Sequence, residues 1–115
     1  MLRGDVVWVD LDPARRGEAD ERRPAVIVSN DGANGTAQRL GRGVVTIVPV
    51  TTNVRRVYPF QVLLPADRCA LAHDSKAHAE QIRSVALDRI GAVAGQLPAD
   101  LLHELDRAIR LHLDL

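Results

Sequence analysis

The chain has 115 residues, of which 46% are hydrophobic and 26% charged, and its 15 basic and 15 acidic residues give a formal net charge of zero. This balance excludes a disordered chain, and the length predicts a single domain that spans residues 1–115. The scarcity of aromatic residues argues against a stacking platform for single-stranded nucleic acid, and the single cysteine excludes an intramolecular disulfide.

No apolar run approaches the roughly 18 residues that a membrane-spanning helix needs. The N-terminus also lacks the apolar segment of a secretory signal. We therefore expect a cytoplasmic protein without membrane contact.

Short runs of β-branched residues predict five or six strands, each ended by a turn signal. In chain order, the predicted strands are residues 6–11, 25–29, 44–50, 60–64, 76–85 and 89–94. Asp12 and Pro13 end the first strand. The charged segment 14–22 that follows lacks periodicity, so we expect an exposed, mobile loop there.

Two helices are predicted. Asn30 and Asp31 are suited to capping a short helix that reaches toward Leu40, and Gly41 and Gly43 predict a turn between it and the strand 44–50. Pro98 fits the first turn of a C-terminal helix, in which the leucines of residues 101–113 recur at helical spacing. Short strands with a terminal helix predict a small, strongly curved antiparallel barrel, with these leucines packed against it as core.

Two of the strands bring a polar group to one end. Arg23 stands immediately before the strand 25–29, and Thr51 and Thr52 follow the strand 44–50. A cation and a hydroxyl held by rigid strands are suited to binding an anion. From residue type alone, the pattern favours an ordinary surface arginine and threonines that merely end a strand.

Four blocks in order resemble the MazF/PemK-type toxins of bacterial toxin–antitoxin systems. The blocks are residues 3–13, 23–31, 48–52 and 81–84. The resemblance covers nearly the whole chain and implies an SH3-like (CcdB/PemK-type) barrel with a short inserted helix and a C-terminal helix. It further implies a homodimer that cleaves single-stranded RNA at selected sequences without a metal ion or cofactor, and so inhibits translation and growth. A cognate antitoxin would cover the active groove.

The resemblance also implies roles for individual residues. Arg23 corresponds to the leading catalytic residue, and its planar guanidinium matches the oxygens of a phosphate. Thr51, rather than Thr52, corresponds to the hydroxyl that orients the phosphate or relays a proton. Glu80 stands where some members carry an aspartate proposed to transfer protons, and His78 stands where they carry an arginine. Because the chain departs at both places, the division of acid and base roles stays open.

On the predicted strand 76–85, residues two apart share a face. His78 and Glu80 are therefore expected on one face. Gln81 and Arg83 have the opposite parity and are expected on the other face. We predict that Glu80 is catalytic and that His78, Gln81 and Arg83 contact RNA, although a solvated strand face fits the same pattern.

Loop cations are the remaining candidates for RNA binding. Arg15 and Arg16 have acidic neighbours, so a solvated charged loop is the safer description of them, whereas Arg55 and Arg56 have fewer acids nearby and are the better candidates. We expect all four cations, together with Thr52, to follow the RNA backbone and its bases.

The sequence bears on three other functions. Cys69 and His73 have a zinc-like interval, but no second pair completes four ligands, so no metal site is predicted. A CcdB-like toxin that binds DNA gyrase shares the barrel and cuts nothing. A non-catalytic SH3-like binding module would need a cluster of exposed aromatic residues, which is missing. The blocks that contain Arg23 and Thr51 favour the nuclease.

Overall fold

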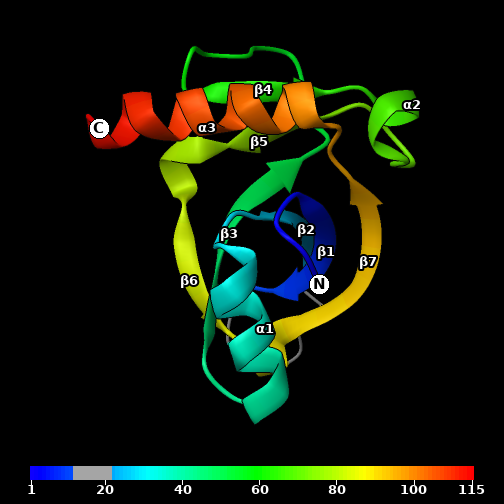
Figure 1. Cartoon of the computed structure of the whole chain (residues 1–115). Coiled ribbons are helices and arrows are strands. Elements are labelled where there is room, and N and C mark those ends of the chain that lie inside the picture. Colours follow the sequence, from blue (N-terminus) through cyan, green and yellow to red (C-terminus); the bar gives the residue numbers. More distant parts are fainter. Residues whose placement is uncertain (12–21) are drawn as a thin grey trace, which may run out of the picture.

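Seven strands form the sheet of this computed structural model, which describes residues 1–11 and 22–115. The strands are β1 (Asp5–Asp10), β2 (Arg22–Ile27), β3 (Val44–Thr51), β4 (Gln61–Leu64), β5 (Ser75–His78), β6 (Arg83–Ala86) and β7 (Ile90–Gln96). The helices are α1 (Asp31–Leu40), α2 (Ala66–Cys69) and α3 (Ala99–Leu113), and the 3₁₀ turns are η1 (Ala79–Gln81) and η2 (Leu87–Arg89). Figure 1 shows α3 lying along β4 and β5 at one end of the molecule, and α1 at the other end.

The strand order is β4-β5-β3-β2-β1-β7, every pairing is antiparallel, and β6 pairs with β3 outside this path. On one side, β3 therefore has two partners in succession. It pairs with β6 as far as Ile47, and with β5 from Val50 onward. Pro49 lies at this change of partner, where a residue without an N–H leaves no donor unsatisfied.

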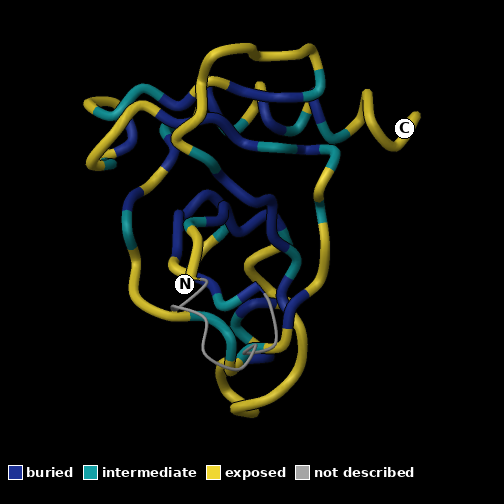
Figure 2. The backbone as a smooth tube through the Cα atoms, turned by 180° about the vertical axis from the view of Figure 1, so that it is seen from behind, coloured by how far each residue is buried: buried dark blue, intermediate teal, exposed yellow. Residues whose placement is uncertain are grey.

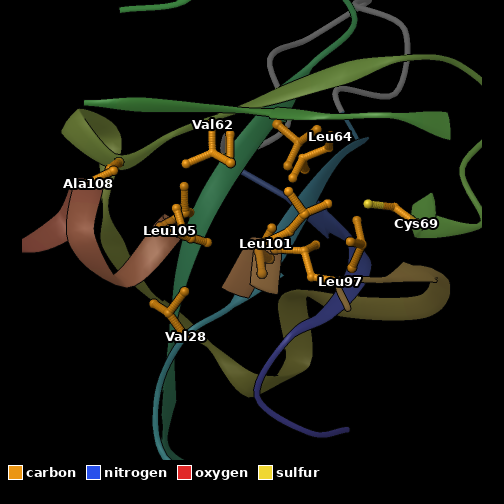
Figure 3. Close-up of a cluster of buried hydrophobic side chains, with 14 residues drawn as sticks. Val28, Val62, Leu64, Cys69, Leu97, Leu101, Leu105 and Ala108 are labelled. Atoms are coloured by element: carbon orange, nitrogen blue, oxygen red, sulfur yellow. The ribbon is translucent and has the colours of Figure 1, made fainter. Parts of the chain in front are cut away.

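The core has two parts because successive side chains of a strand point to opposite faces. One cluster lies beneath α3, whose Leu101, Leu105 and Ala108 pack toward Val62 and Leu64 of β4 (Figure 3). The other cluster lies on the opposite face of the central strands. Its buried members are Val7, Val9, Leu11, Ala25, Ile27, Val45, Ile47 and Val85. Figure 2 shows the buried central strands surrounded by exposed connections.

The local signals for α1 and the turn after it are confirmed. The side chain of Asn30 caps the helix by accepting a hydrogen bond of 2.8 Å from the backbone N–H of Ala33. Gly41 and Gly43 have φ values of 66° and 121°, a region of the backbone that favours glycine. The turn therefore forms where its glycines predicted it.

Four features differ from the predictions. A continuous strand over residues 76–85 is wrong, because η1 separates β5 from β6. Arg23 lies within β2 rather than before it. The helix α2 was not predicted. Leu113, at the end of the predicted core stripe, is 46% exposed because α3 extends beyond the sheet that it covers. Most of the expected loop 14–22 lies outside the described residues.

Candidate active site

The register of β2 on β3 brings Arg23 and Thr51 to the same end of the sheet. Ala25 is opposite Pro49, and the two strands run antiparallel. Continued for two more residues beyond this pair, the same register would bring Arg23 opposite Thr51. Directly opposed residues in an antiparallel pair have neighbouring side chains on one face. The strand pairing itself therefore accounts for the proximity of the predicted cation and hydroxyl.

A cavity of about 360 Å³ lies at this end of β3. Its lining residues are Leu11, Arg23, Pro49, Val50, Thr51, His78, Gln81 and Arg83. The cavity thus gathers candidate residues from β2, β3, β5, η1 and β6, and its volume falls within the range typical of small-molecule sites.

The charges of the lining residues suit an anion. Arg23 and Arg83 are permanently charged guanidiniums with several donors each, and Gln81 and Thr51 add an amide and a hydroxyl. No aspartate or glutamate is among the lining residues that the structure describes. The Oγ1 atom of Thr51 accepts a hydrogen bond of 3.2 Å from the backbone N–H of Asn53, which leaves the hydroxyl proton available to a ligand. The arrangement can bind a phosphate and stabilise additional negative charge on it.

Glu80 lies behind the cavity. Its Oε2 accepts a hydrogen bond of 2.7 Å from Nε2 of Gln61, and its Oε1 is 3.4 Å from Nδ1 of His78. Oε1 is buried and has no hydrogen-bond partner. Glu80 therefore reaches the cavity through His78, whose side chain is 17% exposed.

The predicted division of the two strand faces is wrong. His78, Gln81 and Arg83 line one cavity together, and Glu80 does not line it. The reason is η1, which replaces the two-residue alternation of a strand by a tight turn between β5 and β6. The alternation along the sequence therefore placed His78 on the face of Glu80, whereas His78 shares the cavity with Gln81 and Arg83.

The connection from β3 to β4 carries Arg55 and Arg56, and neither of them lines the cavity; nor does Thr52, which is exposed. Arg56 Nη1 donates to the Tyr58 hydroxyl at 3.1 Å, and its guanidinium lies 5.8 Å from the centroid of that ring. Tyr58 in turn stacks on Phe60 with centroids 5.4 Å apart. The connection is therefore an ordered flank of the site rather than part of its floor. Arg15 and Arg16 lie outside the described residues.

Sequence reasoning missed Lys76 and Gln61, which hold this flank in place. Lys76 is only 8% exposed and sits opposite Thr51 in the β3–β5 pair. Its Nζ donates to the carbonyl oxygen of Arg56 at 2.5 Å. Gln61 accepts a hydrogen bond of 3.2 Å from the backbone N–H of Tyr58. Both roles depend on cross-strand neighbours, so no local signal in the sequence could have found them.

Residues 1–11 and 22–115 contain no group of three or more His, Cys, Asp or Glu side chains placed to hold a metal ion. None of the helices in these two segments is long and apolar enough to cross a membrane.

Residues 2–113 match the family model of the PemK-like, MazF-like toxins of type II toxin–antitoxin systems. The chain belongs to this family. It is 59% identical over 115 residues to the endoribonuclease MazF9 of Mycobacterium tuberculosis, covering 100% of this chain and 98% of the relative. The predicted resemblance is confirmed.

Solved structures confirm the fold. The chain superposes on the crystal structure of MazF from Deinococcus radiodurans with a TM-score of 0.76 and 30% identity, covering 100% of this chain and 97% of the other. It also matches an endoribonuclease in complex with its cognate antitoxin from a mycobacterial species, with a TM-score of 0.77, 25% identity, and coverage of 100% and 96%. The predicted antiparallel fold with an inserted helix and a C-terminal helix is thus that of the MazF toxins.

Proposed function

We propose that this MazF-type endoribonuclease toxin cleaves single-stranded RNA at selected sequences without a metal ion, through attack of the substrate's own 2′-hydroxyl. The observation that carries the proposal is the cavity that Arg23, Thr51 and Arg83 line together from three separate strands. Two guanidiniums there supply fixed positive charge at the place where a phosphate would bind.

The chemistry follows from these groups. As the 2′-oxygen bonds to phosphorus, negative charge develops on the non-bridging oxygens, and the P–O5′ bond then breaks. Arg23 offers a planar pair of donors to two of those oxygens, and Thr51 donates its hydroxyl proton to one of them. The products are a cyclic phosphate and a 5′-hydroxyl end.

The assembly around this site is also proposed. The cavity opens on one small barrel, so two copies would be needed to form a groove that holds several nucleotides. We propose a homodimer that binds RNA along such a groove, in the cytoplasm, and a cognate antitoxin as the partner that blocks it. The MazF relatives solved with MazE antitoxins support the antitoxin as a partner.

The experiment incubates the purified chain with long single-stranded RNA of varied sequence in excess EDTA and analyses the fragment ends. We expect cleavage with cyclic phosphate and 5′-hydroxyl termini. Arg23→Ala should lower the rate by roughly 100-fold or more, the usual cost of removing one transition-state donor. Its thermal stability should stay close to that of the wild type, because the Arg23 side chain is exposed.

Arg42→Ala is the matched control, since Arg42 is an exposed arginine that does not line the cavity. It should cleave as the wild type does. Intact RNA with the wild-type chain would refute the nuclease and favour the gyrase-binding alternative. Full activity in Arg23→Ala would remove Arg23 from the site.

A further inference from the structure

Cleavage by the 2′-hydroxyl needs one proton to leave that hydroxyl and another to arrive at the departing 5′-oxygen. Among the described residues that line the cavity, Arg23 and Arg83 keep their protons and Gln81 does not titrate. Among these described lining residues, only His78 is of a type that ordinarily gains and loses a proton near neutral pH. His78 is therefore the natural proton donor among the described residues of the cavity.

The hydrogen bonds of Gln61 fix how this imidazole is held. Gln61 Oε1 accepts from the backbone N–H of Tyr58, so Nε2 is the amide nitrogen that donates. One of its protons goes to Glu80 Oε2 at 2.7 Å, and Nε2 is also 3.1 Å from Nδ1 of His78. In the neutral ring Nδ1 is then an acceptor, and the ring proton resides on Nε2.

The buried Oε1 of Glu80 accounts for the other state of the ring. When His78 gains a second proton, Nδ1 becomes a donor and can no longer accept from Gln61. Glu80 Oε1, 3.4 Å from Nδ1 and without a hydrogen-bond partner, is the acceptor within reach. Buried carboxylate oxygens are rarely left without a partner, which supports an interaction of this oxygen with the protonated ring. Each protonation state of His78 thus has its own partner.

We infer that His78 is the general acid of RNA cleavage in this chain, and that Glu80 and Gln61 are positioning residues that hold its Nδ1 edge; this inference rests on the proposed function. The 2′-oxygen bonds to phosphorus as the P–O5′ bond breaks, and the 2′-hydroxyl proton passes to solvent. The imidazolium gives its Nε2 proton to the 5′-oxygen. The neutral ring then takes a proton from solvent, which restores the starting state.

Several charged groups surround His78 and affect the stability of its protonated ring. Glu80 on η1 favours the imidazolium, whereas Arg23 on β2 and Arg83 on β6 oppose it. On the far side of Gln61, Glu104 and Arg107 of α3 contribute charges of opposite sign. Lys76, on the same strand, is engaged with the carbonyl of Arg56. Among the charged groups that the structure describes around His78, Glu80 is the acid whose oxygen lies 3.4 Å from Nδ1.

The test uses an RNA oligonucleotide that contains a wild-type cleavage site, and a second copy in which a sulfur replaces the bridging 5′-oxygen. A thiolate leaves without being protonated, so the sulfur substrate does not need a general acid. We expect His78→Gln to cut the all-oxygen substrate about 100-fold or more slowly than the wild type, which is the usual worth of a general acid. On the sulfur substrate its rate should return to within about 10-fold of the wild type.

Arg23→Ala is the control, and it should stay slow on both substrates because stabilisation of the phosphate is needed for each. Glu80→Gln should slow cleavage of the all-oxygen substrate more than cleavage of the sulfur substrate, a difference that a merely structural role would not cause. Equal losses for His78→Gln on both substrates would overturn the assignment of His78. If the wild-type chain cuts neither substrate, the proposed function itself fails, so the two failures are distinguishable.

Discussion

Gly95→Ala should strongly destabilise the fold, because β7 runs directly against the backbone at the end of α2. An alanine Cβ at this position would lie 2.3 Å from the carbonyl oxygen of Cys69 and 2.7 Å from Cδ2 of Leu71. Ordinary contacts begin near 3.4 Å, so the carbonyl and the strand must separate by about 1 Å. The leucine side chain can rotate away, but the carbonyl belongs to the backbone.

The strand cannot easily move instead. Gly95 is buried and pairs with Val6, which is fully buried in the core beneath α3. Overpacking a well-packed interior costs about 1–3 kcal/mol, and a backbone clash belongs at the upper end of that range. At roughly 4 °C per kcal/mol for a domain of this size, the melting temperature should fall by about 12 °C.

Gly35→Ala is the matched control. Gly35 lies inside α1, and a Cβ there would meet no atom within 4 Å. Because alanine favours a helix over glycine by about 1 kcal/mol, this variant should be more stable than the wild type. Urea unfolding followed by circular dichroism compares the two variants. A Gly95→Ala midpoint equal to that of the wild type would refute the close packing of β7 against α2.

Two other predictions concern the core. Leu105→Ala should lower the free energy of unfolding by about 2–5 kcal/mol, because the Leu105 side chain is fully buried between α3 and the sheet. Leu113→Ala is the control: its side chain is exposed, so the free energy of unfolding should change by less than about 0.5 kcal/mol. Equal losses for the two variants in urea unfolding would contradict this packing. Burial raises the pKa of the Cys69 thiol, so the folded chain at pH 8 should react slowly with a disulfide reagent and quickly once urea unfolds it, and fast labelling of the folded chain would contradict the burial.

Local patterns predicted most of the strands because each signal lies within a few residues. The β-branched runs gave β1, β3 and β7 to within a few residues at each end, and the Gly41 and Gly43 turn was read directly from its glycines. The prediction of one continuous strand from β5 to β6 was wrong, because the break at η1 depends on pairing with strands that are distant in sequence. Residues 79–81 contain no glycine or proline to mark a break.

The candidate site also contains residues that the sequence predicted and residues that it could not predict. Arg23 and Thr51 were found through ordered sequence blocks, and the register of β2 and β3 then gave a physical reason for their meeting. Glu80 was placed in the site by resemblance, yet it lies behind His78 and does not line the cavity. Gln61, which joins Glu80 to His78, comes from a strand that no site motif includes. Contacts between strands distant in sequence cannot be read from either strand alone.

The change of partner along β3 explains why the cavity lies where it does. On the edge of β3 that faces away from β2, no described strand pairs with Val48 or Pro49, between the pairing with β6 and the pairing with β5, and η1 connects β5 to β6 there. Side chains at the two ends of this turn, His78 and Arg83, then face the same opening as Thr51. Backbone pairing, not side-chain packing, thus sets the positions of the polar groups. Because these groups are exposed or half-buried, they contribute little to the core, and the same sheet can carry different side chains at this opening without loss of the fold.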